Sequence, residues 1–425
     1  MKILHTSDWH LGQHFMGKSR RDEHAAFIAW LLALIERESV HAVIVAGDVF
    51  DTGSPPSYAR EMYHQLVLDL KAVNCQLVIV GGNHDSVSML NESKSLLSYL
   101  GTHVLAQAQP DDLESHVIPL LDPGQETAAW LCAIPYLRPR DVMKSIQGQS
   151  EQEKKHELMT QIGDFYQSVY EVAKAKNTTL RSPVPIIGTG HLTAMGGQIS
   201  ESVRDLYVGT LEALPTSVFP AFDYLALGHI HRAQAISQDG KFRYSGSPIP
   251  LSFDELSREK SLVIIDTEAL AERAMARDLF SDDDQPIKIE SIPRFQSMQS
   301  LAGSLEEVFQ AIEQLDLARE KEQGKTLWLE VTVLADDYLS DVQKRLMEAI
   351  VDKPIELLRV MRKRSDALSD SAFEQRQTLS ELSVADVFEQ SLKANMSLEE
   401  EDSQQLTALF QRCLLEMEED KEAEA

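Results

Sequence analysis

The sequence contains few cysteines, and their spacing excludes two kinds of site. Only three occur in 425 residues, Cys75, Cys132 and Cys413, and no CxxC pair is present. A disulfide framework and a thiolate metal site are therefore not expected. Long apolar runs are also lacking: Leu31–Ile35 is far too short to span a bilayer, and the N-terminal residues lack a signal-peptide core. These absences predict a cytoplasmic protein that does not enter a membrane.

Basic residues are also in short supply. The chain has 40 lysines and arginines against 67 acidic residues, for a net charge of −27. Nucleic-acid-binding proteins usually carry a basic surface. The acidic residues gather at Asp282–Asp284 and after Glu399, where solvated linker and helix faces are the simplest interpretation. If the substrate is DNA, we expect this chain alone to bind it weakly. Metal ions or a partner protein would then have to supply the positive potential that attracts DNA.

The first part of the chain alternates apolar strands with helical patterns, which predicts an α/β fold with helices on the faces of a sheet. Long helices are expected at Glu23–Glu38, Tyr58–Ala72 and Glu151–Lys176. The predicted strands are Lys2–His5, Ala42–Ala46, Leu77–Val80, His116–Leu120, Ala129–Ala133, Pro185–Thr189, Tyr224–Leu227, Lys241–Tyr244 and Leu262–Asp266. We assign residues 1–281 to one domain.

The acidic segment Asp282–Pro286 ends in proline and predicts a linker. A smaller α/β pattern follows, and we assign residues 287–364 to a second domain. Its predicted strands are Ile287–Ile292, Thr326–Leu334 and Ile355–Val360, and its predicted helices are Ser304–Leu315 and Leu339–Ile350.

The last part of the chain, residues 366–425, predicts a helix–loop–helix tail. Ser383–Leu392 and Glu400–Met417 each place large apolar side chains on one helical face. Such stripes either pack onto the second domain or need an external surface to cover them. Two amphipathic helices after an apparent domain end favour binding to a partner.

Five short segments share one format, an apolar strand followed by a turn that presents metal-ligating residues. They are Asp8-Trp9-His10, Gly47-Asp48, Gly82-Asn83-His84-Asp85, Gly190-His191 and Gly228-His229-Ile230-His231. Binding sites in open α/β sheets form at the carboxyl ends of strands, so these turns are expected to converge. A motif of this kind that occurs alone is more often a surface turn or a helix cap than a ligand. Because all five occur in one chain, each at a strand end, they favour a single metal site.

The residue types of these turns suit a pair of divalent cations. Aspartate offers an anionic oxygen that can bridge two ions, asparagine a neutral carbonyl and histidine a nitrogen. Mixed nitrogen and oxygen ligands without sulfur favour Mn, Fe or Zn over Mg or Ca. Two such ions about 3.5–4 Å apart hold a phosphodiester and activate a water molecule.

These motifs resemble the calcineurin-like metallophosphoesterase superfamily. The stretches HTSDWHLGQ, VAGDVFDTGSPPSYAR, VIVGGNHDS, GHIHRAQ and YSGSPIPLSFDE are closer still to the bacterial SbcD family, the nuclease subunits of SbcCD complexes. In the tail, SELSVADVFEQSL is similar to the family's partner-binding segment. The resemblance implies a metal-dependent DNA exonuclease and endonuclease.

The resemblance also implies roles for single residues. One ion would be held by Asp8, His10, Asp48 and His231, and the other by Asp48, Asn83, His191 and His229, with Asp48 bridging. His84 would act on the scissile phosphate as an acid or charge stabiliser, oriented by Asp85. Asp51 is left unassigned because some relatives carry histidine there. The Tyr244–Asp254 loop, with Gly246 and Ser247, would lie near the site.

The wider implications concern architecture and partners. The resemblance implies a four-layer α/β/β/α metallophosphoesterase domain, an α/β capping domain and a homodimer within a heterotetramer. It also implies two ions per chain, most simply Mn²⁺. The tail would bind an SbcC-type ATPase. ATP would be used by that partner, since this chain has no GxxxxGK[ST] loop.

Two other functions compete with this interpretation. A phosphatase on the same fold typically carries GDxxDRG and GNHE, whereas this chain has GDVFDTG and GNHD. A scaffold that had lost its activity would be expected to lack a ligand position, and none is missing here.

Overall fold

A computed structural model describes residues 1–142, 150–198, 200, 213–275, 286–334 and 341–363. Contacts divide the chain into two units, Met1–Arg362 and Lys363–Ala425, and the described residues lie almost entirely in the first. The two amphipathic stripes of the predicted tail fall outside the described residues. No helix in the described ranges is long and apolar enough to cross a membrane.

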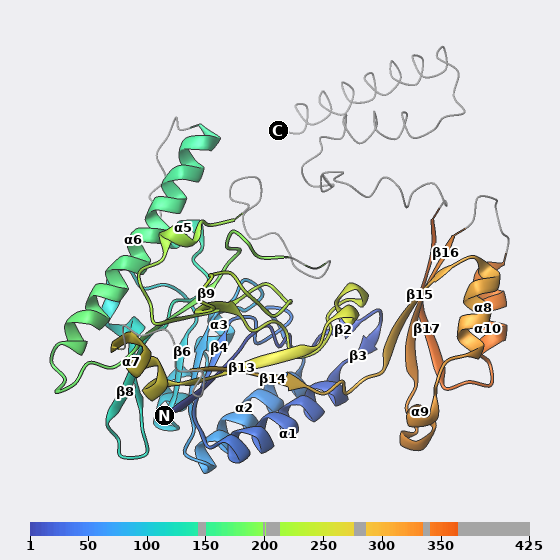
Figure 1. The fold of residues 1–425 in the computed structure, drawn as a ribbon, viewed down its shortest axis with the longest axis horizontal. Helices are drawn as coiled ribbons and strands as arrows, with labels where there is room; N and C mark the ends of the chain where they lie inside the picture. The colour runs from blue at the N-terminus through green and yellow to red at the C-terminus, as the bar shows by residue number, and fades with distance from the viewer. Residues whose placement is uncertain (143–149, 199, 201–212, 276–285, 335–340, 364–425) are drawn as a thin grey trace, which may run out of the picture. The chain divides into compact units, whose positions relative to one another are not determined.

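The first sheet contains six strands (Figure 1). Four of them run parallel: β1 (Lys2–Thr6), β4 (Val40–Ala46), β5 (Gln76–Val80) and β6 (Thr102–Leu105). Next to β1, the antiparallel strand β13 (Lys260–Asp266) extends the sheet and is followed by β14 (Ile287–Ile292). The parallel strands are connected by α1 (Arg21–Glu38), α2 (Ser57–Ala72), α3 (Val87–Asn91) and α4 (Lys94–Tyr99).

The second sheet also has six strands, in the order β11 (Gln234–Ala235), β12 (Phe242–Tyr244), β10 (Tyr224–Gly228), β9 (Ile186–His191), β8 (Thr127–Cys132) and β7 (Val117–Leu121). Strands β8, β9, β10 and β12 run parallel. The long helix α6 (Glu151–Asn177) contacts β7, β8 and β9. A capping box between Ser150 and Glu153 begins this helix.

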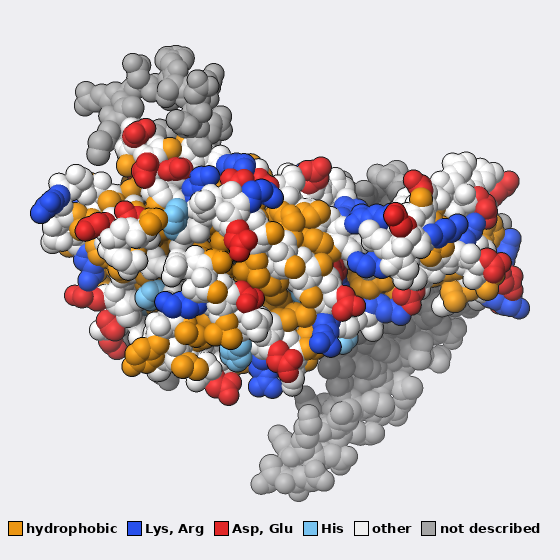
Figure 2. Space-filling view, turned by 90° about the horizontal axis from the view of Figure 1, so that it is seen from below, with side chains coloured by type: hydrophobic (Ala, Val, Ile, Leu, Met, Phe, Trp, Pro, Cys, Tyr) orange, Lys and Arg blue, Asp and Glu red, His pale blue; other side chains and the backbone are white. Residues whose placement is uncertain are grey.

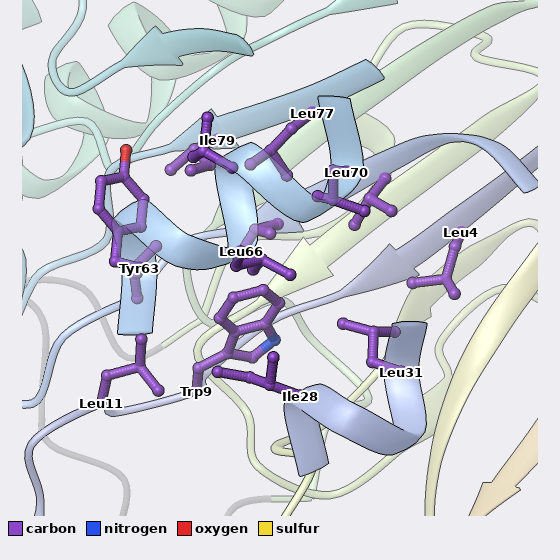
Figure 3. Packing of buried hydrophobic residues seen from close by; sticks show 14 of the residues in the cluster. Leu4, Trp9, Leu11, Ile28, Leu31, Tyr63, Leu66, Leu70, Leu77 and Ile79 are labelled. Carbon is purple, nitrogen blue, oxygen red and sulfur yellow. The ribbon is translucent and has the colours of Figure 1, made fainter. Parts of the chain in front are cut away.

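Three apolar clusters define the layers of these two sheets. Figure 3 shows the first, in which Trp9, Leu31 and Leu66 join α1 and α2 to one face of the first sheet. The second packs α6 on the outer face of the other sheet. The third lies between the sheets and combines residues such as Ile44 and Ala226. The order is therefore helices, sheet, sheet, helix.

A separate small sheet follows in the chain, formed by β15 (Met298–Gly303), β16 (Leu327–Leu334) and β17 (Ile355–Lys363). Helices α8 (Leu305–Glu313) and α10 (Val342–Ile350) pack on one face around Leu329, Val331 and Leu346, and α9 (Ala318–Gln323) precedes β16. This confirms a second α/β arrangement in the C-terminal part of the chain.

The predicted boundary at residue 287 lies one strand too early. A strand does form at Ile287–Ile292, but β14 pairs with β13 in the first sheet through six residue pairs. The small sheet begins only at Met298. The other predicted strands and helices in the described residues are present, with small shifts at their ends.

Candidate metal centre

The five motif turns lie at the carboxyl ends of strands that are neighbours within their sheets. Asp8, Asp48 and Asn83 follow β1, β4 and β5 of the first sheet, while His191 ends β9 and His229 follows β10 of the second. Two contacts join the sheets here. The His229 backbone N–H donates to Asp8 Oδ1 at 2.9 Å, and His191 Nδ1 lies 2.9 Å from the Ala46 carbonyl. The turns therefore meet at one place.

The backbone at this place is strained. Nine non-glycine residues in the described ranges have a positive φ, and four of them are candidate ligands: Asp8 at 54°, His10 at 47°, Asp48 at 52° and His229 at 95°. Such conformations cost free energy and are enriched at functional sites. The fold holds these four residues in unfavourable conformations that point their side chains toward one another.

Two glycines allow the turns to approach this closely. A Cβ added at Gly82 would lie 2.1 Å from Asp48 Oδ1, and one added at Gly47 would lie 2.2 Å from His191 Nδ1. Any side chain at these positions would displace a candidate ligand. The glycines that precede the ligands in the motifs are thus part of the site's geometry.

One group of candidate ligands consists of Asp8, His10 and His231, whose ligand atoms lie within 4.8 Å of one another. All three residues are buried. The His10 and His231 rings are 5.2 Å apart at their centroids. The Asp8 carboxylate accepts a hydrogen bond from Ser7 Oγ at 2.5 Å, and Ser7 in turn contacts Ser245 of the predicted neighbouring loop.

A second group consists of Asp8, Asp48 and His191. His191 Nε2 lies 3.2 Å from Asp48 Oδ2 and 2.9 Å from Asn83 Oδ1. The His229 ring lies beside that of His191, with centroids 5.4 Å apart. All seven predicted metal ligands are therefore brought together, and Asp48 lies where both predicted sets can share it.

A third group places His84 with His10 and Asp48. His84 is half-buried, and its Nδ1 lies 2.7 Å from the Asp51 carbonyl. The Asp51 carboxylate in turn lies 3.2 Å from His10 Nδ1. Asp51, which sequence left without a role, therefore contacts both histidines. Its place three residues after Asp48 in the motif GDVFD was the available signal.

Asp85, which was predicted to orient His84, forms hydrogen bonds with the backbone of two turns. Its buried carboxylate accepts hydrogen bonds from the N–H groups of Gly82, Val49 and Phe50, at 2.9, 3.2 and 3.0 Å. Burial and the nearby charge of Asp48 raise the pKa of Asp85 to about 6, against the effect of these donors. Asp85 therefore joins the turn that carries His84 to the turn that carries Asp48, while the His84 ring itself contacts Asp51.

Neighbouring charged side chains shift the pKa values of several residues at the site. Burial alone would raise the pKa of Asp48, but the charge and hydrogen bond of His191 outweigh it and hold the pKa far below its ordinary value. Burial would lower the pKa of His191, but Asp48 raises it to about 9. The pKa of His229 is well below its ordinary value because the ring is buried beside His191. The carboxylates thus attract positive charge to this place.

These residues fit divalent cations. Asp8 and Asp48 are buried carboxylates, which are costly to bury without compensating positive charge. Neither ring nitrogen of His10 makes a well-directed hydrogen bond within the described part of the chain, although Nδ1 lies near Asp51. A cation bound among these oxygen and nitrogen donors would compensate the buried carboxylates and give the His10 ring a partner.

Comparisons with known proteins agree with this geometry. A family model described as calcineurin-like phosphoesterase matches residues 1–233, and the model of the type 5 capsule protein repressor C-terminal domain, SbcD_C, matches residues 294–396. The SbcD subunit of the nuclease SbcCD from Escherichia coli K12 is 44% identical over 417 residues, covering 97% of this chain and 98% of that relative. The chain belongs to the SbcD family of calcineurin-like phosphoesterases.

Other SbcD-family relatives align over much of their length. The SbcD subunit of the Rhodobacter capsulatus nuclease SbcCD is 32% identical, covering 84% of this chain and 86% of the relative. That of Bacillus subtilis is 27% identical, covering 80% of this chain and 81% of the relative. The start of the SbcD_C match at residue 294 also agrees with a second region that begins after β14.

Proposed function

We propose that this SbcD-family chain is a metal-dependent DNA nuclease that hydrolyses phosphodiester bonds at the site where the carboxyl ends of strands from its two six-stranded sheets meet. The observation that carries the proposal is the convergence of all seven ligand candidates around Asp48. Relatives that match nearly the whole chain are named as nuclease subunits. The activities expected are duplex exonuclease, stimulated by a partner ATPase, and endonuclease on single strands and hairpins, in DNA repair, recombination or replication.

Two divalent ions are the cofactors in this proposal. Asp8, His10, Asp48 and His231 would hold one, and Asp48, Asn83, His191 and His229 the other. When bound, such ions hold the scissile phosphate, lower the pKa of a water molecule and neutralise the leaving oxygen. The four imidazoles favour Mn²⁺ over Mg²⁺, which prefers oxygen ligands.

His84 is the proposed acid or charge stabiliser. Its Nδ1 contacts the Asp51 carbonyl, so Nε2 is the ring nitrogen that would act on the substrate. A half-buried ring beside the ligand cluster is placed to reach a phosphate, whereas the aspartate and histidine ligands themselves are almost fully buried. His84 therefore moves or shares a proton at Nε2, and Asp85 holds the turn on which it sits.

The assay that tests this function compares substrates and metals. We expect hydrolysis of bis-p-nitrophenyl phosphate, and of blunt duplex and hairpin DNA when the partner ATPase is present, with Mn²⁺ far more effective than Mg²⁺ at equal concentration. Faster turnover of the monoester p-nitrophenyl phosphate than of any diester would instead indicate a phosphatase. Equal rates with Mn²⁺ and Mg²⁺ would contradict the ligand assignment.

An SbcC-type ATPase is the proposed partner, bound by residues 366–425. The relatives' name places them in an SbcCD complex, and the SbcD_C match extends to residue 396. The part that follows β14 would act as a cap that controls access of DNA. A chain truncated after Ser365 should lose the partner and the ATP-dependent exonuclease activity but keep Mn²⁺ binding. A truncated chain that still co-purifies with the ATPase would refute this assignment.

A second copy of the chain is the other proposed partner. Apolar side chains gather on the face formed by α1 and α2, as Figure 2 shows. A groove of about 710 Å³ there is lined by Ile28, Leu32, Met62 and Leu68, and Leu68 is 50% exposed. Apolar patches of this kind mark interaction sites, and a homodimer within a heterotetramer would cover this one.

A further inference from the structure

A buried carboxylate stands behind one of the proposed metal ligands. Glu255 lies in η3, the short 3₁₀ helix Phe253–Ser257, and is 3% exposed. Its Oε1 is 3.4 Å from Nδ1 of His231. Because Nδ1 faces this carboxylate, Nε2 is the ring nitrogen that would face an ion. Glu255 is the last residue of the family-like stretch YSGSPIPLSFDE, but no role was predicted for it.

Several donors hold the Glu255 carboxylate in place. Lys260 Nζ lies 2.6 Å from Oε2 and also donates to the His231 carbonyl at 3.0 Å. The Leu251 backbone N–H donates to Oε2 at 3.0 Å, and Ser200 Oγ donates to Oε1 at 2.9 Å. These donors fix the Glu255 carboxylate where the imidazole meets it. Lys260 thus contacts both the backbone of the ligand and the carboxylate behind it.

The other end of η3 is anchored in the small sheet. Phe253 packs in an apolar cluster with Phe15, Met298 and Trp328, of which the last two belong to β15 and β16. The Phe15 ring lies 5.3 Å from that of Phe253 and stacks on Trp328 at 5.9 Å. Contacts between β15 and η3 also link the two parts of the chain. One short helix therefore touches the small sheet and the candidate metal centre.

We propose that η3 positions His231 for metal binding and couples that ligand to the small sheet. Glu255 fixes the ring through Nδ1, and Phe253 ties the same helix to Trp328. A carboxylate behind a ligating histidine sets its tautomer and orientation, and its loss typically weakens metal binding about 10–100-fold. The inference rests on the proposed function, in which His231 holds an ion. It makes Glu255 a positioning residue that does not touch the substrate.

The first test measures Mn²⁺ binding to the full chain by electron paramagnetic resonance titration, without substrate. His231→Ala should remove or strongly weaken one of two ions. Glu255→Gln keeps the shape of the side chain and should weaken the same ion about 10-fold or more, with the second ion unchanged. The control Glu259→Gln removes one exposed negative charge nearby and should leave both affinities as in the wild type.

The second test uses two neighbouring residues of β16 that face opposite sides of the small sheet. Trp328 faces η3, whereas Leu329 is buried against α8 and α10. Trp328→Ala should weaken the same Mn²⁺ ion several-fold, and Leu329→Ala should leave it unchanged although it also opens a cavity. Equal weakening by both variants, or by neither, would refute the coupling.

The outcomes separate this inference from the proposed function. If His231→Ala leaves two ions bound with wild-type affinity, the ligand assignment itself is wrong. If His231→Ala loses an ion but Glu255→Gln does not weaken it, the metal centre stands and the positioning role of Glu255 is refuted.

Discussion

Asp48 lies between two groups of candidate ligands, and its surroundings explain why few substitutions there should be tolerated. Its carboxylate accepts from the His84 backbone N–H and contacts His191, while its backbone has a positive φ. A Cβ at Gly82 would collide with it. The position proposed for a bridging carboxylate thus depends on residues from three turns of the first and second sheets.

Asp48→Ala and His84→Ala should separate metal binding from chemistry. Asp48→Ala should lose both ions and all activity, because one carboxylate serves both. His84→Ala should keep two ions per chain and lose cleavage by about 10²-fold or more, as for a lost acid–base group. Elemental analysis of the purified variants and rates of DNA cleavage are the measurements. Loss of an ion from His84→Ala would make His84 a ligand, which its place beside His10 and Asp48 also permits.

The site was predictable at the level of its motifs. Strand-end turns rich in Asp, Asn and His place their side chains near one another because parallel strands end at one sheet edge. The structure brings Asp8 close to His231 and Asn83 close to His191, as expected. The role of Glu255 was not predicted, because the residue ends the stretch YSGSPIPLSFDE but no strand-end turn presents it. Its side chain reaches His231 through the path of the loop after β12, which spacing along the chain does not reveal.

At the scale of elements, two buried histidines support the contact between layers. His5 of β1 lies 2.9 Å from the Tyr224 hydroxyl of β10 in the other sheet, and His24 of α1 lies 2.9 Å from the Trp9 carbonyl. Burial lowers the pKa of His5 to about 3 and that of His24 to about 3. Both rings are therefore neutral in the folded protein near neutral pH.

These pKa shifts predict acid sensitivity. In the unfolded chain both histidines would titrate near pH 6.5, so below that pH the unfolded state binds more protons than the folded state. The free energy of unfolding should fall by about 1.4 kcal/mol per pH unit for each ring as the pH drops from about 6.5 toward 3. Urea unfolding at several pH values measures this slope. His5→Gln should have a shallower slope than the wild type, and an unchanged slope would show that His5 does not contribute to the acid sensitivity.

Elements were predicted well where the pattern was local. Apolar runs such as Ala42–Ala46 and the long helices formed where expected. Strands β6 and β15 were missed, since both are short and mix polar with apolar residues. The sequence also predicted the wrong sheet for β14, for a different reason. The alternation in Ile287–Ile292 predicts a strand, but which sheet it joins depends on β13, whose edge it covers.

At the scale of the whole molecule, the apolar α1–α2 face is the proposed contact with a second copy of the chain. Leu32→Glu with Leu68→Glu places two charges in the groove and should convert a dimer to a monomer in analytical ultracentrifugation, because burying an unpaired carboxylate is costly. Leu96→Glu changes an equally apolar residue that is 65% exposed on α4, outside the groove, and should remain dimeric. A wild-type monomer, or a dimeric groove variant, would refute this interface.

Anomalous diffraction from crystals grown with Mn²⁺ would locate the ions of the proposed metal centre. We expect two peaks, one among Asp8, His10, Asp48 and His231 and one among Asp48, Asn83, His191 and His229, with Asp48 contacting both. A single peak, or a peak coordinated by His84 in place of these ligands, would contradict this assignment.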